Sequence, residues 1–149
     1  MSSVTDKDQH SGTDKLEPEG GRITVRRKPV QHEHHIQAAF FRWAGLTGGK
    51  YPELKALYAV PNGGTRHKLE AVKLKREGVR PGIPDVHLPV PRGKYAGLWI
   101  EFKSESGRVT EVQAEWHALL RSLGHRVEVA RSWTDAANIV EMYLQGEGA

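Results

Sequence analysis

The sequence predicts an α/β fold in which a mixed β-sheet is flanked by helices. Segments with apolar residues at helical spacing alternate along the chain with short segments of strand character. The expected order is helix, strand, helix, strand, strand, helix, strand, helix, which is typical of a sheet with helices on its faces. With 149 residues, the chain is long enough for one such domain and too short for two ordinary ones.

The first part of the chain differs from the rest in composition and charge. Residues 1–28 are polar and show no apolar period, so they are predicted to form a disordered N-terminal tail, with the folded domain at residues 29–149. Residues 1–21 contain two lysines and five acidic residues, net −3, although the whole chain carries +4. The remainder is therefore +7, and a basic body of this kind suits a polyanionic partner.

The domain is expected to begin with a helix and a strand. The helix should start near Gln31, because Ile36, Phe40 and Trp43 recur at helical spacing before a pair of glycines stops it. After a polar loop, residues 57–60 are expected to be a short strand, which ends at a cluster of turn-forming residues.

A second helix and a hairpin are expected next. Residues 65–77 read as a helix with Leu69 and Val72 along one stripe and basic side chains around the rest. Residues 85–89 and 96–103 read as two strands joined by a loop of proline, arginine and glycine, which predicts a β-hairpin.

The last third of the chain predicts helix, strand, helix. The third helix should begin at Thr110 and place these apolar residues on one face: Val112, Trp116, Leu119, Leu120 and Leu123. Residues 126–130 alternate as a strand, and residues 134–144 form a final helix with three residues inward: Ala137, Val140 and Leu144.

Several function classes are excluded by composition. The chain has no cysteine, so disulfides and thiolate zinc sites cannot form. No apolar run approaches the roughly 18 residues that a membrane span requires, and the start of the chain lacks the features of a signal peptide. A cytoplasmic protein is expected.

One predicted strand carries charged residues on one of its faces. Because strand side chains alternate, Glu101 and Lys103 share a face with Trp99, and the apolar residues between them face the other way. Burial of such a pair is costly unless the charges are paired or bound to a metal, so a structural salt bridge is one interpretation. The hairpin, however, also brings Asp85 beside Glu101. Two carboxylates that converge beside one lysine repel each other unless a cation lies between them, and Mg²⁺ prefers such oxygen ligands.

These residues carry a family resemblance. Pro84-Asp85, followed after fifteen residues by Glu101-Phe102-Lys103, resembles the PD-(D/E)XK nuclease signature, and the wider sequence resembles its VRR-NUC branch. The resemblance implies a restriction-endonuclease-like core and a Mg²⁺- or Mn²⁺-dependent endonuclease. It also implies that Asp85, Glu101, the carbonyl of Phe102 and Glu33 hold the metal, with Lys103 as the catalytic lysine.

Glu33 and Gln113 complete the catalytic set that the resemblance implies, and each has a second interpretation. Glu33 lies three residues before Ile36, on the inward face of its helix, but an acid there also suits the helix dipole. Gln113 stands at the third position after Thr110, which is the pattern of a capping box, so it can cap the third helix.

A group of polar and basic residues is expected to contact the DNA backbone. Its members are Asn62, Gly63, Gly64, Arg66, Lys68, Lys73 and Arg80. The histidines around Glu33 lack the spacing of a His-Glu-x-x-His zinc helix, so zinc is not expected there.

The resulting hypothesis is a metal-dependent DNA endonuclease. The resemblance implies a phage or bacterial protein that acts as a homodimer on branched DNA, in the manner of a Holliday-junction resolvase. Two symmetric cuts call for two sites related by a twofold axis. Two alternatives stay open: a nickase or flap nuclease within a larger repair or replication complex, and a DNA-binding module that does not cut.

Overall fold

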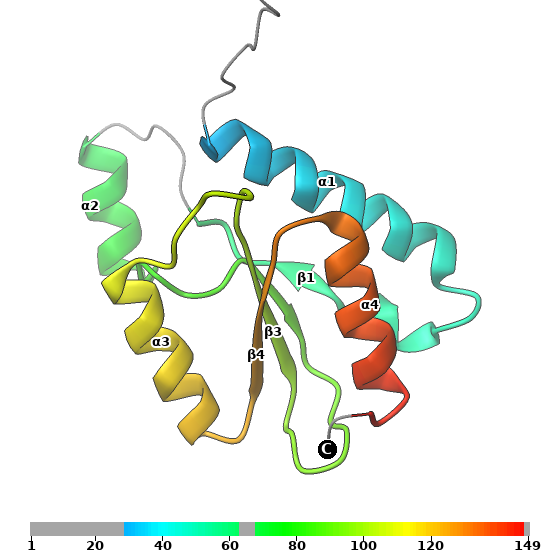
Figure 1. Ribbon diagram of the computed structural model, residues 1–149. Helices are drawn as coiled ribbons and strands as arrows, with labels where there is room; N and C mark the ends of the chain where they lie inside the picture. Colours follow the sequence, from blue (N-terminus) through cyan, green and yellow to red (C-terminus); the bar gives the residue numbers. More distant parts are fainter. Residues whose placement is uncertain (1–28, 63–67, 148–149) are drawn as a thin grey trace, which may run out of the picture.

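A computed structural model of the chain describes residues 29–62 and 68–147 (Figure 1). The predicted tail lies outside the described residues, as do three of the expected DNA contacts, Gly63, Gly64 and Arg66. The described part has the predicted α/β fold, a mixed four-stranded sheet with helices on both of its faces.

The helices and strands follow the predicted order with one addition. The helices are α1 (Pro29–Thr47), α2 (Lys68–Arg76), α3 (Glu111–Ser122) and α4 (Trp133–Leu144). The strands are β1 (Tyr58–Ala59), β2 (Val86–Leu88), β3 (Leu98–Phe102) and β4 (Arg126–Ala130). The addition is η1 (Pro52–Ala56), a 3-10 helix in the stretch expected to be a loop, where a proline starts the turn and Leu54 is buried. Among the described residues, no helix has the length and apolar character needed to cross a membrane.

The sheet brings the signature residues to one level. Its strand order is β1-β2-β3-β4, with antiparallel pairing from β1 to β3 and parallel pairing of β3 with β4, which α3 connects. The predicted hairpin of β2 and β3 is confirmed, with Val86 opposite Ile100. Asp85 therefore lies at the level of Glu101, because antiparallel strands run in opposite directions from that pair.

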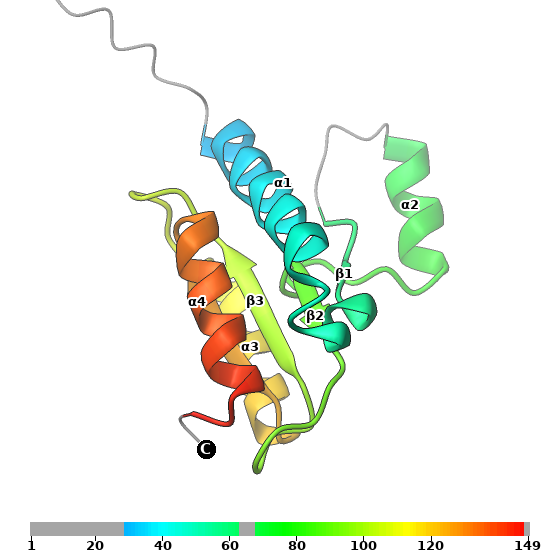
Figure 2. The same ribbon diagram turned by 90° about the vertical axis from the view of Figure 1, so that its right-hand side faces the viewer.

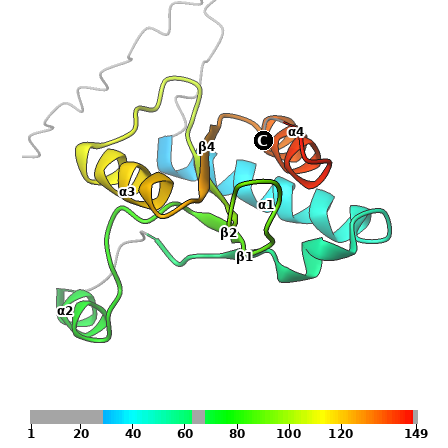
Figure 3. The same cartoon turned by 90° about the horizontal axis from the view of Figure 1, so that it is seen from below.

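Helices cover the two faces of the sheet unequally. α1 and α4 pack against each other and against β3 on one face, whereas α3 packs against β4 on the other. Figure 2 shows α1 and α4 side by side, and Figure 3 shows α3 and α4 on opposite sides of β4. α2 stands at the periphery, away from the sheet (Figures 1 and 3).

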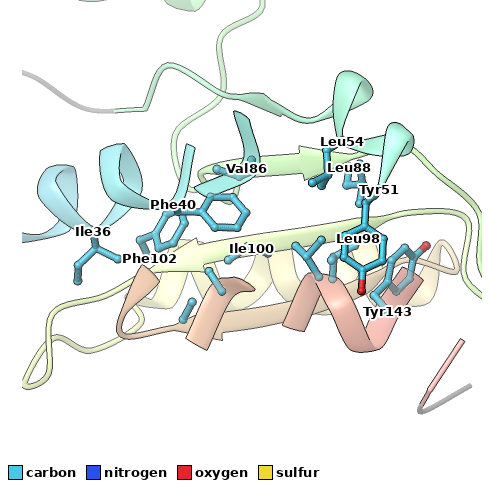
Figure 4. Packing of buried hydrophobic residues seen from close by; sticks show 14 residues of the cluster. Ile36, Phe40, Tyr51, Leu54, Val86, Leu88, Leu98, Ile100, Phe102 and Tyr143 are labelled. Atoms are coloured by element: carbon cyan, nitrogen blue, oxygen red, sulfur yellow. The ribbon is translucent and has the colours of Figure 1, made fainter. Parts of the chain in front are cut away.

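The apolar core lies between the sheet and the α1–α4 pair (Figure 4). The apolar face of β3 is fully covered there, and the ring of Phe102 packs against Phe40 of α1 at a centroid distance of 5.6 Å. Leu98, Ile100 and Phe102 point into this core, so the intervening Glu101 points to the other face of the sheet, where it contacts Gln113 and His117 of α3, and Lys103 shares that face. The strand alternation predicted for β3 is confirmed.

Two predicted apolar faces are wrong in detail. On α3 the buried residues are His117 and Leu120, whereas Val112, Leu119 and Leu123 are 46–62% exposed. The reason is that α3 covers a strand face that carries charged side chains, so its inward face is partly polar. On α2, Leu69 and Val72 do not reach the core and are 86% and 58% exposed. In α4, Ala137 and Val140 are buried and Leu144 packs against the core, as predicted.

Candidate active site

A cavity of about 300 Å³ opens beside the end of β3, between α1 and α3. Its wall includes all five residues predicted to be catalytic: Glu33, Asp85, Glu101, Lys103 and Gln113. It also includes Asn62 and Phe102. The structure therefore brings together in one cavity wall five predicted residues that are up to 80 positions apart in the sequence.

The loop before β2 is fixed at three points and positions Asp85. Gly82 has φ +88°, and a Cβ on it would lie 2.6 Å from a methyl carbon of Val112 on α3, so only glycine fits. The indole N–H of Trp116 donates to the carbonyl of Pro81 at 2.9 Å, and the amide nitrogen of Asn62 donates to the carbonyl of Ile83. The Gly-Ile-Pro-Asp stretch thus owes its shape to contacts with α3 and with the end of β1.

Asp85 is joined to β3 by a hydrogen bond. The backbone N–H of Phe102 donates to Oδ2 of Asp85 at 2.7 Å. Burial raises the pKa of Asp85, while this N–H and the charge of Lys103 act in the opposite direction. The bond sets the aspartate beside the Glu101-Phe102-Lys103 triplet, as the hairpin predicted.

Glu101 is the most enclosed acid of the site, with 1% of its surface exposed. Its Oε1 lies 3.1 Å from Nζ of Lys103 and accepts a hydrogen bond of 2.7 Å from Nε2 of Gln113. Burial, followed by the charge of Asp85, raises the pKa of Glu101 to about 7. Lys103 is itself only 6% exposed, so the salt bridge predicted from the sequence exists and is buried.

Gln113 caps α3 and also contacts Glu101. The side-chain Oε1 of Gln113 accepts a hydrogen bond from the backbone N–H of Thr110 at 2.9 Å. The backbone N–H of Gln113 donates to Oγ1 of Thr110 at 3.3 Å, which completes the capping box. The nitrogen of the side-chain amide donates to Glu101. One side chain therefore caps α3 and holds the carboxylate.

Glu33 reaches the site from α1. Its Oε1 accepts a hydrogen bond of 3.1 Å from the backbone N–H of Ser104, directly after the triplet. Its charge contributes to the raised pKa of both Asp85 and Glu101, which places the three acids within electrostatic reach of one another. The inward orientation predicted for Glu33 is confirmed.

The expected DNA contacts are spread more widely. Lys73 on α2 and Arg80 are exposed, and Arg80 adjoins Pro81 at the rim of the cavity. Asn62 lies in the wall itself, where its amide nitrogen is engaged with the loop backbone. Lys68 begins α2.

Sequence reasoning missed several residues of the site. His34 and Gln37 of α1 line the cavity, and His117 of α3 lies behind Glu101. Arg131 donates from Nη1 to the carbonyls of Ser104, Glu105 and Gly107 and so fixes the loop after β3. The only signal for Gln37 was its position four residues after Glu33 on the predicted helix, and neither His34 nor Arg131 gave one.

The donor set fits a hard divalent cation. Asp85 and Glu101 both line the cavity and supply carboxylate oxygens, which are the ligands that Mg²⁺ prefers. Residues 29–62 and 68–147 contain no group of three or more acidic or histidine side chains arranged to hold an ion alone. A backbone carbonyl or water would therefore have to share in the coordination, as Mg²⁺ commonly allows.

Comparisons with known proteins agree with this geometry. The family model of the VRR-NUC domain matches residues 20–133 of the chain. A solved structure described as a VRR_NUC domain protein superposes with a TM-score of 0.66 at 27% sequence identity, covering 78% of this chain and 90% of its own. The comparison with curated proteins gave no match. With the PD-(D/E)XK-like fold in place and the family model matching most of its length, this chain belongs to the VRR-NUC domain family of nucleases.

Proposed function

We propose that this chain is a divalent-metal-dependent endonuclease that hydrolyses phosphodiester bonds in DNA. One observation carries the proposal: Asp85 and Glu101 meet across the β2–β3 hairpin beside a buried Lys103, in the wall of an open cavity. Burial, followed by the charge of Asp85, raises the pKa of Glu101, and a cation between the two carboxylates would relieve that repulsion.

The carboxylates of Asp85 and Glu101 and the backbone carbonyl of Phe102 would hold Mg²⁺ or Mn²⁺ directly in this proposal. Glu33 would hold the ion through a water ligand, because no three acidic side chains of the described residues are arranged to bind one ion together. When bound, the ion supplies positive charge that polarises the phosphate and lowers the pKa of a water ligand. Glu101 is the acid whose protonation is most altered by the site, so ion binding there depends on the loss of a proton that is half-bound near pH 7.

Lys103 and Gln113 act on the reaction through position and charge. The ammonium group of Lys103, 3.1 Å from Glu101, can orient the attacking water and stabilise negative charge on the phosphate oxygens. The water oxygen gives up a proton and forms the new bond to phosphorus as the bond to the leaving oxygen breaks, and the leaving oxygen takes up a proton. Gln113 keeps the Glu101 carboxylate oriented through its 2.7 Å bond.

DNA would be held through its phosphates by basic residues around the cavity. Lys73 and Arg80 are exposed, Asn62 lies in the cavity wall and Lys68 begins α2. The other proposed contacts, Gly63, Gly64 and Arg66, stand between Asn62 and Lys68 in the sequence and lie outside the described residues. Contacts of this type position the duplex without reading its sequence. The proposed nuclease is therefore expected to cut DNA without preference for particular bases.

The preferred substrate in this proposal is branched DNA, cut by a homodimer. The homodimer has a candidate surface in the exposed apolar residues Leu69 and Val72 of α2 and Val112 and Leu119 of α3. Next to them α2 carries Arg76, and α3 carries Glu111 and Glu115. In the proposed dimer, α2 of one copy would pack against α3 of the other, so that apolar residues meet and the basic charge of α2 lies against the acidic charge of α3. A twofold axis would repeat the same contact with the two copies exchanged.

The test is cleavage of supercoiled plasmid by the full chain with Mg²⁺, with Mn²⁺, and with EDTA. Wild type should nick the plasmid only with metal, Lys103→Ala should not, and Lys94→Ala, a matched change at an exposed lysine of the hairpin loop, should act as wild type. Binding without metal-dependent nicking by wild type would favour the non-cleaving module. A panel of four-way, flapped and linear DNAs then separates a junction resolvase from a flap nuclease.

A further inference from the structure

Two buried polar atoms face each other behind the site without a hydrogen bond. Nε2 of His117 on α3 lies 3.7 Å from Oε2 of Glu101, and neither atom has another partner. His117 is 4% exposed and Glu101 is 1% exposed, so water does not reach them freely. A buried donor or acceptor left unpaired costs about 1–3 kcal/mol, so such a pair calls for an explanation.

The surroundings of Glu101 show what is incomplete. Its Oε1 is held from two sides, by Gln113 and by Lys103. Its Oε2 has only His117 in front of it. Gln113 and His117 are four residues apart on α3 and therefore lie on the same face of the helix, one turn apart. The helix thus presents two side chains to the two oxygens of one carboxylate.

The ring of His117 can supply the donor that Oε2 lacks. Nε2 is the ring atom that faces Oε2, and an imidazole nitrogen that carries a proton donates to a carboxylate oxygen. The distance from Nε2 to Oε2 is about half an ångström beyond the longest ordinary N–H···O hydrogen bond, and hydrogen bonds in an active site are often long before the site binds its ligands.

We propose that His117 is a positioning residue of this site, whose Nε2–H group holds Oε2 of Glu101 as Gln113 holds Oε1. The proposal rests on the proposed function, because it concerns the acid that would hold the metal. Ligating carboxylates are themselves oriented by hydrogen bonds, and loss of such a partner typically weakens metal binding by about 10- to 100-fold. His117 does not touch substrate in this account and acts only through Glu101.

Mn²⁺ binding to the full chain without DNA tests the effect, measured by titration calorimetry. His117→Leu removes the donor and keeps an apolar side chain in the space, and we expect Mn²⁺ to bind about 10-fold more weakly. His117→Gln offers an amide N–H at similar reach and should restore most of the affinity. His87→Leu is the matched control, because His87 is a half-buried histidine whose Nε2 is also unpartnered but lies outside the cavity. It should bind Mn²⁺ as wild type does.

The hydrogen bond itself is tested on the wild-type protein by ¹⁵N NMR of its histidines. The proposal requires that Nε2 of His117 carries the proton; a bare Nε2 overturns it, whether or not the variants fold. Equal Mn²⁺ affinity of His117→Leu and wild type would also overturn it, as would an equal loss in His117→Gln and His117→Leu. Wild type that neither binds Mn²⁺ nor nicks plasmid would refute the proposed function instead, and the tautomer would still decide the hydrogen bond.

Discussion

The backbone N–H of Phe102 donates to the carboxylate of Asp85 at 2.7 Å, and this bond joins the two halves of the nuclease signature. It crosses from the middle of the Glu-Phe-Lys triplet to the start of β2, so the main chain of one motif holds the side chain of the other. The bond opposes the effect of burial on the pKa of Asp85 and holds the acid in the wall of the cavity that Glu101 also lines.

The stability of the metal-free protein should depend on Glu101 in a defined pH range. Its pKa is about 7 in the folded state and 4.5 ordinarily, so the folded state binds the proton more tightly and Glu101 destabilises the fold as pH rises from about 4.5 to 7. Glu101→Gln should therefore gain thermal stability relative to wild type as pH is raised through that range, by a few kcal/mol at most. Melting curves in EDTA at pH 5 and pH 8 check this. The comparison with the variant is needed because the histidines with lowered pKa, His87 and His117, act in the opposite direction at low pH. A difference in melting temperature that does not change with pH would contradict the raised pKa.

Thr110 and Gln113 should separate capping from function. Thr110→Val removes the oxygen that accepts from the Gln113 N–H, and its expected cost is about 1 kcal/mol of stability with metal binding retained. Gln113→Leu removes the cap and the bond to Glu101 together, so it should weaken Mn²⁺ binding as well. Thermal melts and Mn²⁺ titrations of both variants measure the two effects. If both variants bound Mn²⁺ equally, the bond to Glu101 would have no role in the site.

Arg131 should stabilise the loop after β3. Its Nη1 donates to three backbone carbonyls there, and one of the same residues, Ser104, also binds Glu33 through its N–H. Arg131→Leu should cost roughly 1–3 kcal/mol of unfolding free energy, because these carbonyls lose a charged donor. Arg108→Leu, in the same loop but exposed, is the control and should cost little. Denaturant unfolding of the two variants measures both free energies of unfolding. Equal values for the two variants would show that the hydrogen bonds of Arg131 do not stabilise the fold.

The exposed apolar residues of α2 and α3 should support the homodimer. Leu69→Asp and Leu119→Asp place a charge in the proposed contact and should each shift the protein toward monomer in light-scattering measurements. Leu46→Asp is matched to them, since Leu46 of α1 is 89% exposed and belongs to neither helix, and it should leave the dimer intact. A wild-type chain that is monomeric, or a Leu46 variant that dissociates as the others do, would count against this surface.

The sequence predicted what depends on local pattern and strand pairing. Alternation on β3 separated Glu101 and Lys103 from the apolar core, and the hairpin brought Asp85 to them. The sequence could not show which face of α3 is buried. The strand face that α3 covers is polar, so the apolar residues of the helix do not mark its buried side. His117 and Arg131 could not be found either, since their partners lie on other elements and no local pattern marks such contacts.

The central claim is that Asp85 and Glu101 together coordinate one divalent ion. Anomalous diffraction from crystals of the full chain grown with Mn²⁺ tests it most directly. We expect one strong anomalous peak in the cavity, with oxygens of both carboxylates as ligands, and its loss in Asp85→Asn. A peak elsewhere, with none between these two side chains, would contradict the account.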